Sequence, residues 1–329
     1  MPNSDPPIGV LLMAYGSPDR LEDVEAYYTH IRGGRRPSPT AVAALQARYR
    51  RIGGRSPLLE ITRAQARALE AALNGTVAAG AEGFRVYVGM RHWRPFIGEA
   101  IARMAADGVR DAVGLSLAPH YSRLSVGAYI EAAQQALQEL QAPLRLRFVE
   151  HWHTHPLFLE ALADRVQRGL ERFSPAERER LILIFTAHSL PQRILEWGDP
   201  YPRHLHETCV GVVQRVGLEA TRWRFAYQSA GHTAEPWLGP DLSEVLERLA
   251  RQGVPAVLVC PVGFVADHLE VLYDLEIEAR EQAEGLGMHL ERTDSLNDDP
   301  RLIQALRDVV WNAARGEQTT LLRHDVGVT

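Results

Sequence analysis

Short, almost uninterrupted apolar runs recur along the 329-residue chain and constrain its fold more than any other feature. The runs cover residues 8–13, 85–89, 112–117, 181–186, 224–228 and 256–260. Between most of them, apolar residues return at every third or fourth position, as on one face of a helix; clear examples are 97–106, 157–170, 242–249 and 301–311. Strands that are apolar on both sides are typical of parallel sheets covered by helices on both faces. The sequence therefore predicts an α/β protein with doubly wound parallel sheets.

The two halves of the chain are similar in pattern. GVLLMAYGSP at 9–18 is similar to LILIFTAHSLP at 181–191, and FRVYVGMRHWRP at 84–95 is similar to RFAYQSAGHTAEP at 224–236. The first half is about 33 residues longer between these landmarks. We interpret the pattern as two similar lobes. Gene duplication explains the similarity, although the strand–helix pattern common to all βαβ units could also produce it.

These landmarks give a domain prediction. The first lobe covers 6–149, with an insertion at about 26–59, and the second covers 150–298. We expect a helix at about 299–315 to return to the first lobe, and 316–329 to form a disordered tail. In parallel sheets, ligands bind at the carboxyl ends of the strands. The residues that follow the apolar runs are therefore the first candidates for a site.

Composition excludes several classes of function. All 36 basic residues are arginine, so no lysine can form a Schiff base or complete a P-loop. The net charge of −5 argues against a general nucleic-acid binder. Two cysteines cannot ligate an iron–sulfur cluster and provide no disulfide framework, which favours a reducing compartment.

No targeting or membrane signal stands out. The first residues, MPNSDPP, lack the basic and apolar regions of a signal peptide. The longest apolar stretch, 254–266, is too short to cross a bilayer and contains Pro255 and Pro261. We therefore expect a cytoplasmic protein without an integral membrane segment, and a monomer.

The insertion is strongly basic. Residues 26–59 contain no Asp or Glu, and they contain Arg32, Arg35, Arg36, Arg48, Arg50, Arg51 and Arg55. Guanidinium groups bind carboxylates and phosphates in a bidentate manner. The segment thus predicts the entrance of a binding site for an acidic ligand. The alternative is a solvated basic loop.

Two further features carry candidate chemistry. His188 follows the apolar run 181–186, where a site is expected, although a single histidine there can also be structural.

Glu270, Asp274 and Glu278 are four residues apart and would form one acidic stripe on a helix. Carboxylates at this spacing repel each other unless a cation lies between them, and Glu270 also lies among apolar residues that predict burial. The alternative for the stripe is a solvated acidic face.

A third cluster is HWHTHP, which contains His151, His153 and His155. The spacing could chelate a metal from a strand, but Pro156 ends the run and no nearby carboxylate completes a site. We interpret these histidines as surface residues that are either solvated or chelate metal adventitiously.

Longer motifs make the chain resemble the ferrochelatases, and within them the water-soluble coproporphyrin ferrochelatases of Gram-positive-type bacteria. The motifs are LLMAYGSP, YYTHIRGGR, IGGRSPL, LAPHYS, FTAHSLP, GDPYP, Gln228–Ser229, PWLGPD and PVGFVADHLEVLYD. The resemblance covers nearly the whole chain, apart from HWHTHP and the residues after about 316. It implies a chelatase-like fold of two Rossmann- or flavodoxin-like lobes, each with a four-stranded parallel sheet, and a porphyrin cleft between them.

The resemblance also implies roles for individual residues. His188 and Glu270 would contact Fe²⁺ and assist removal of the pyrrole protons, and Tyr15 would approach the metal from the other face of the macrocycle. Asp274 and Glu278 would form an outer path for metal or protons. The positions that contact porphyrin in relatives are Tyr15, Arg32, Arg48, Tyr49, Ser56 and Tyr129.

The implied reaction inserts Fe²⁺ into coproporphyrin III in haem biosynthesis. Fe²⁺ is a substrate, no permanent cofactor is expected, and a downstream haem-pathway enzyme is a candidate partner. A neutral His188 would accept a proton, and arginines would grip the propionates while the ring bends. The alternatives are a chelatase for protoporphyrin IX or for cobalt, and a porphyrin or metal carrier without catalysis.

Overall fold

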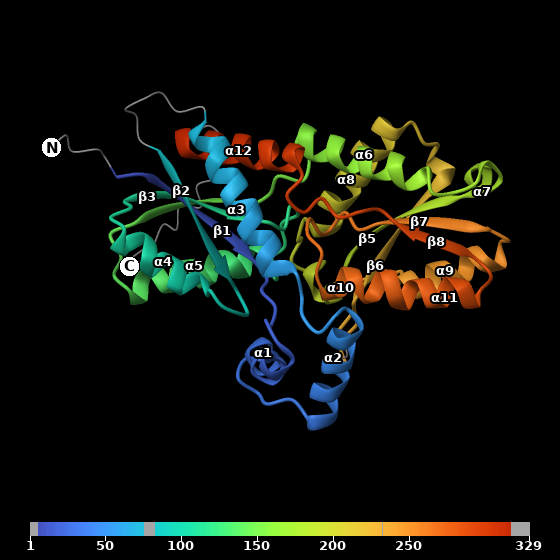
Figure 1. Ribbon diagram of the computed structural model, residues 1–329, viewed down its shortest axis with the longest axis horizontal. Helices are drawn as coiled ribbons and strands as arrows, with labels where there is room; N and C mark the ends of the chain where they lie inside the picture. The colour runs from blue at the N-terminus through green and yellow to red at the C-terminus, as the bar shows by residue number, and fades with distance from the viewer. Residues whose placement is uncertain (1–5, 76–82, 232, 317–329) are drawn as a thin grey trace.

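A computed structural model describes residues 6–75, 83–231 and 233–316. The predicted tail after Gly316 lies outside the described residues. The chain forms two separate four-stranded sheets, and all strand pairs in both are parallel (Figure 1). This confirms the predicted α/β class with doubly wound parallel sheets.

The two sheets have the same topology. The first, in the order β2-β1-β3-β4, contains β1 (Ile8–Ala14), β2 (Phe84–Met90), β3 (Asp111–Ser116) and β4 (Arg145–Val149). The second, in the order β6-β5-β7-β8, contains β5 (Ile182–His188), β6 (Trp223–Gln228), β7 (Ala256–Cys260) and β8 (His289–Arg292). Strands β1 and β5 therefore occupy equivalent interior positions, and their carboxyl ends lead to Tyr15 and to His188.

Helices cover both faces of each sheet (Figure 1). Those of the first lobe are α3 (Leu58–Asn74), α4 (Ile97–Ala106), α5 (Val126–Glu139) and α12 (Pro300–Arg315). Those of the second are α6 (Pro156–Leu170), α7 (Pro175–Arg180), α8 (Tyr201–Val216), α9 (Leu242–Arg251) and α11 (Arg280–Gly285). The short turns are η1 (Leu21–Asp23), η2 (Gln192–Ile194) and η3 (Ala220–Arg222). None of the described helices combines the length and apolar character needed to span a bilayer.

One apolar core runs through both lobes. It joins Leu12 and Leu115 of the first sheet to Leu183 and Phe185 of the second, all of them fully buried. Helix α12 contributes Leu306 to this core and contacts α3, β3 and β4 of the first lobe as well as α6 of the second. The shared core fixes the two lobes to each other on the side of α3, α12, α6 and α8 (Figure 1).

The insertion forms a helical pair on the opposite side (Figure 1). Helices α1 (Val24–Ile31) and α2 (Pro39–Arg51) project away from the first sheet and contact each other. A small apolar cluster of Val24, Tyr49 and Leu269 joins this pair to the second lobe. Both lobes and the insertion thus meet beside the carboxyl ends of β1 and β5.

Candidate functional site

His188 and Glu270, the pair selected from the sequence, lie together. His188 is the last residue of β5, and Glu270 lies in the short helix α10 (Leu269–Leu272). Nε2 of His188 is 3.5 Å from Oε1 of Glu270, and 30% of each side chain is exposed. Glu270 was expected to be buried; it is half-buried instead, because its carboxylate faces polar groups rather than the apolar residues beside it in the sequence.

A second histidine, which the sequence did not single out, completes the surroundings of Glu270. Nε2 of His268 is 3.5 Å from Oε2 of Glu270, so each carboxylate oxygen faces an imidazole. The side-chain amide of Gln228 donates a 2.8 Å hydrogen bond to the backbone carbonyl of Glu270. The available signal was position: His268 lies two residues before Glu270, and Gln228 is the register partner of His188 at the end of β6.

The electrostatics of the pair differ from the expectation of a neutral imidazole. Burial would lower the pKa of His188, but the Glu270 carboxylate and the carbonyl of Ser189 raise it to about 9. Burial would likewise raise the pKa of Glu270, but His188 and His268 hold it well below its usual range. Without metal, the pair is therefore an imidazolium beside a carboxylate at neutral pH. A neutral His188, as expected from the sequence, therefore requires loss of this proton.

Tyr201 and Gly263 position His188. The hydroxyl of Tyr201, at the start of α8, donates a 3.0 Å hydrogen bond to the backbone carbonyl of His188. Gly263 packs so closely that an added Cβ would lie 2.6 Å from Cβ of Ala187. A side chain at position 263 would displace the end of β5, so this glycine is required by close approach.

Asp274 and Glu278 lie in the π-helix η4 (Asp274–Ala279), where a regular helix was expected. Asp274 is only 8% exposed; it is paired with Arg48 and accepts a hydrogen bond from the Ser229 hydroxyl. Burial raises the pKa of Asp274 to about 6, against the opposing effect of Arg48. Glu278 is exposed and has no ion pair among the described residues. The expected stripe therefore consists of a half-buried Glu270, a buried Asp274 with a pKa of about 6 and an exposed Glu278.

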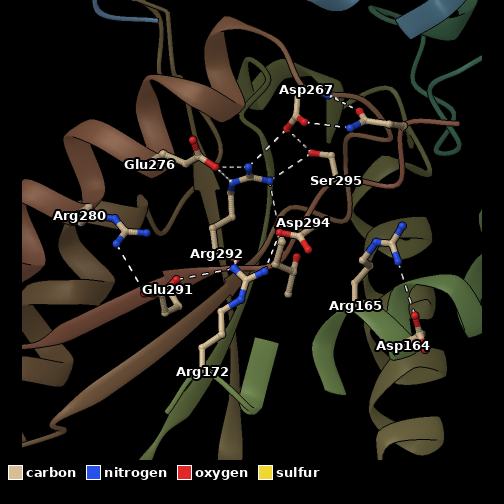
Figure 2. Close-up of polar contacts among 12 residues, drawn as sticks. Asp164, Arg165, Arg172, Asp267, Glu276, Arg280, Glu291, Arg292, Asp294 and Ser295 are labelled. Carbon is tan, nitrogen blue, oxygen red and sulfur yellow. Dashed lines mark hydrogen bonds and ion pairs between the residues drawn. The ribbon is translucent and has the colours of Figure 1, made fainter. Parts of the chain in front are cut away.

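A buried arginine pairs with two acidic residues, Asp267 and Glu276, that lie on either side of Glu270 in the sequence (Figure 2). Arg292, at the end of β8, is 6% exposed and pairs with Glu276 of the π-helix and with Asp267, at 3.4 Å. The carboxylate of Asp267 also accepts hydrogen bonds from Ser295 at 2.7 Å and from Asn297 at 2.9 Å. Glu270 lies between Asp267 and Glu276 in the sequence, so this network holds the chain on both sides of it.

Tyr15 follows β1, and 41% of its surface is exposed to solvent. Its ring lies 4.6 Å from that of His92, centroid to centroid. Gly16 has a φ of +92°, and an added Cβ would lie 2.8 Å from the backbone nitrogen of Trp93, so only glycine allows the chain to turn here. Burial and then the charge of Glu270 raise the pKa of the Tyr15 hydroxyl, which is therefore a neutral phenol.

The remaining residues predicted to contact porphyrin differ in how far they are exposed to solvent. Tyr49 and Tyr129 are buried, and burial together with the charge of Glu270 raises the pKa of both. The hydroxyl of Ser56 accepts a hydrogen bond from the amide of Leu58 at 3.3 Å, at the start of α3. Arg32 is exposed at the end of α1, 5.7 Å from the ring centroid of Tyr28.

The basic insertion borders an open cleft. Its volume is about 690 Å³, within the range of small-molecule sites. The cleft is lined by Ala26, Thr29, His30, Ile31, Gly33, Gly34, Arg91, His92 and Ala132. Of the arginines of the insertion, four have acidic partners: Arg36 with Glu25, Arg48 with Asp274, Arg51 with Glu281, and Arg55 with Glu60. Arg32, Arg35 and Arg50 have none among the described residues, so their charges are available to a ligand.

Comparisons with known proteins agree on one family. A sequence model of the family described as Ferrochelatase matches residues 7–314. The chain is 44% identical over 301 residues to a ferrochelatase of Herpetosiphon aurantiacus, covering 92% of this chain and 97% of that one. It is also 44% identical over 304 residues to the coproporphyrin III ferrochelatase of Geobacillus thermodenitrificans, covering 92% and 95% of the two chains.

Solved structures agree on the fold. The sirohydrochlorin chelatase SirB of Bacillus subtilis subspecies spizizenii, in complex with cobalt, superposes with a TM-score of 0.54 at 12% identity. That match covers 94% of this chain and 96% of the other. SirB from Bacillus subtilis with Fe³⁺ gives a TM-score of 0.55 at 12% identity, covering 95% and 99%. The predicted chelatase-like architecture is thereby confirmed.

Proposed function

The chain belongs to the ferrochelatase family, and on this premise we propose that it inserts Fe²⁺ into coproporphyrin III, with release of the two pyrrole protons, in haem biosynthesis. The observation that carries the proposal is the His188–Glu270 pair at 3.5 Å, open to solvent over about a third of each side chain. One imidazole and one carboxylate form a weak, incomplete ligand set, which suits an ion that has to be passed on.

The pair offers a defined place for iron. In the metal-free protein, the charge on His188 occupies the position beside Glu270 that a cation would take. An arriving Fe²⁺ replaces that proton, since a histidine ligand has to be neutral. His268, on the other carboxylate oxygen, keeps Glu270 ionised while this exchange takes place.

Asp274 is suited to carry protons away. A general base works best when its pKa lies near the working pH, and the pKa of Asp274 is about 6. Its carboxylate lies near that of Glu270, whose charge contributes to raising this pKa. We therefore assign Asp274 to the path by which pyrrole protons leave, and Glu278 to the exposed end of that path.

The preference for coproporphyrin follows from charge. This porphyrin carries four carboxylates, and protoporphyrin IX carries two. Arg32, Arg35 and Arg50 have no acidic partner among the described residues and can contact the additional carboxylates. Tyr15, a neutral phenol beside the cleft, is assigned to the opposite face of the ring from His188.

The partners and compartment follow from the same premise. Fe²⁺ and coproporphyrin III are substrates, and the enzyme that receives the product would be the next in the pathway. Cys209 and Cys260 are buried free thiols, which suits the cytoplasm.

The test compares two porphyrins under anaerobic conditions. The protein is mixed with Fe²⁺ and either coproporphyrin III or protoporphyrin IX, and loss of the free-base absorption spectrum is followed; Co²⁺ replaces Fe²⁺ in a parallel series. We expect faster insertion of Fe²⁺ into coproporphyrin III, and almost none in His188→Ala. No acceleration over buffer would indicate a carrier, and equal or faster use of protoporphyrin IX would refute the proposed substrate.

A further inference from the structure

Three histidines outside the porphyrin site are brought together at the junction of the lobes. His151 and His153 lie in the connection between β4 and α6, and His204 lies in the first turn of α8. One ligand nitrogen from each lies within 4.8 Å of the others. In the sequence, HWHTHP ends at Pro156 and no nearby carboxylate completes a site, which indicated surface histidines; His204 comes from the distant helix α8.

His153 provides the strongest evidence for a ligand. It is 2% exposed, and its Nε2 donates to Oε2 of Glu207 at 2.7 Å. Its Nδ1 is buried and has no hydrogen-bond partner among the residues that the structure describes. A buried nitrogen without a partner is costly. Histidines that bind metals almost always donate their second nitrogen to a carboxylate or carbonyl, and Glu207 already provides this contact.

The rings of His204 and His151 both lie close to that of His153. The ring of His204 stacks on that of His153 at 3.9 Å between centroids, and His151 lies 5.1 Å from His153 and 4.8 Å from His204. Burial lowers the pKa of His153, and it lowers that of His204 to about 3, so both rings are neutral at pH 7. His151 is exposed.

Binding requires the rings to turn. Nitrogen ligands of a tetrahedral Zn²⁺ lie about 3.3 Å apart, given bond lengths of about 2.0–2.1 Å, so the three nitrogens close by about 1.5 Å at most. Because a nitrogen lone pair lies in the plane of its ring, the stacked rings of His153 and His204 turn away from each other so that both point at one ion. His204 would exchange a long hydrogen bond, 3.3 Å from the amide of Tyr121 to its Nδ1, for the metal.

We propose that His151, His153 and His204 bind one divalent transition-metal ion, at a site separate from the His188–Glu270 pair. Three imidazoles with an open fourth position suit Zn²⁺, Co²⁺ or Ni²⁺ and do not suit Mg²⁺ or Ca²⁺, which prefer oxygen ligands. The ion ties the connection that leads into the second lobe to α8, whose first residue, Tyr201, holds the carbonyl of His188. It is a stabilising ion rather than a substrate.

The experiment removes the insertion site first. Untagged protein carrying His188→Ala and Glu270→Gln is freed of metal and titrated with Zn²⁺ by calorimetry, and with Co²⁺ by visible absorption of the four-coordinate ion. We expect one equivalent of Zn²⁺ to bind and to raise Tm. Adding Glu207→Gln should weaken binding by about 10–100-fold, and adding His151→Ala or His204→Ala by at least as much.

A matched control lies on the same helix. His206 is exposed, two positions after His204, and its ring lies near Trp223 instead of the cluster; His206→Ala should leave Zn²⁺ binding unchanged. His151 is also exposed, so His151→Ala tests the site even where His204→Ala fails to fold. The proposal is overturned if the background protein binds no equivalent of Zn²⁺, or if the bound equivalent survives His151→Ala unchanged.

Discussion

Arg48 connects the insertion to the acidic segment, and its replacement tests how the site is held together. Its guanidinium pairs with Asp274 and lies 4.6 Å from the ring centroid of Tyr273. Arg48→Met keeps an apolar stem that can pack on Tyr273 and removes the charge. We expect the variant to lose stability by an amount that increases with pH.

The pKa of Asp274 sets the size of this loss. Its ordinary value is 3.8, and in the folded protein it is about 6. At about 1.4 kcal/mol per pKa unit, ionised Asp274 already costs the folded state about 3 kcal/mol. Without Arg48 this pKa rises further, but the cost at pH 7 is limited to about 4 kcal/mol, because the carboxyl then takes up a proton. Arg48→Met therefore costs about 1 kcal/mol through Asp274 at pH 7.

The sign of the pH dependence follows from the same pKa. Below pH 6, Asp274 is largely protonated with or without Arg48, so only packing is lost. As the pH rises through 6, the wild-type carboxyl ionises beside the guanidinium, whereas that of the variant keeps its proton to a higher pH. The difference in free energy of unfolding then grows by up to about 1.4 kcal/mol per pH unit, until the variant's own carboxyl ionises.

The assay is urea unfolding at pH 5.5, 7 and 8, followed by circular dichroism. Wild type, Arg48→Met, Asp274→Asn and the double variant form a cycle, and the effect of Arg48→Met should lose its pH dependence in the Asp274→Asn background. An effect of equal size at all three pH values, or one that is largest at pH 5.5, would refute this account. Kinetics add a second criterion: acting through Asp274, Arg48→Met should lower kcat, whereas a propionate contact would raise KM for coproporphyrin III.

Three further outcomes are expected. Glu270→Gln should lower kcat for insertion by about 10²–10⁴-fold with little change in porphyrin affinity measured by fluorescence quenching, and wild-type turnover would remove Glu270 from the mechanism. Arg292→Met leaves the partly exposed carboxylates of Asp267 and Glu276 without their shared cation and should cost about 1–3 kcal/mol in urea unfolding; a loss below about 0.5 kcal/mol would contradict a structural role for Arg292. Burial lowers the pKa of His204 to about 3, so the folded state loses stability as the pH falls from about 6.5 towards 3; His204→Gln should flatten the decline between pH 7 and 5, and equal slopes would contradict this.

The sequence marked six of the eight described strands by apolar runs. The run at 181–186 is apolar throughout, and β5 is buried along nearly its whole length. No apolar run marked β4 and β8, whose sequences are RLRFV and HLER. Both lie at an edge of their sheet and carry polar side chains at alternate or successive positions, whereas β2 and β6, at the opposite edges, contain longer apolar runs. Their pattern alone does not distinguish them from loops.

The site was predictable as far as it depends on strand ends. His188 could be selected because it ends β5, but the roles of its neighbours depend on contacts between distant segments. Arg48 and Asp274 are separated by 226 positions, and no local pattern predicts their pairing. The π-helix was missed for the same reason, since Arg48 and Arg292 hold its carboxylates from other elements.

Contacts between distant segments also reduce the number of arginines in the basic insertion that can bind an acidic ligand. Counted from the sequence, seven arginines face an acidic ligand, but Arg36, Arg51 and Arg55 are neutralised by surface acids, and Arg48 by Asp274. A charge that already has a partner gains less from a propionate, because the existing pair has to be broken first. Selectivity for a porphyrin with four carboxylates should therefore depend on the unpaired arginines, Arg32, Arg35 and Arg50, and the effect of replacing them should diminish at high salt.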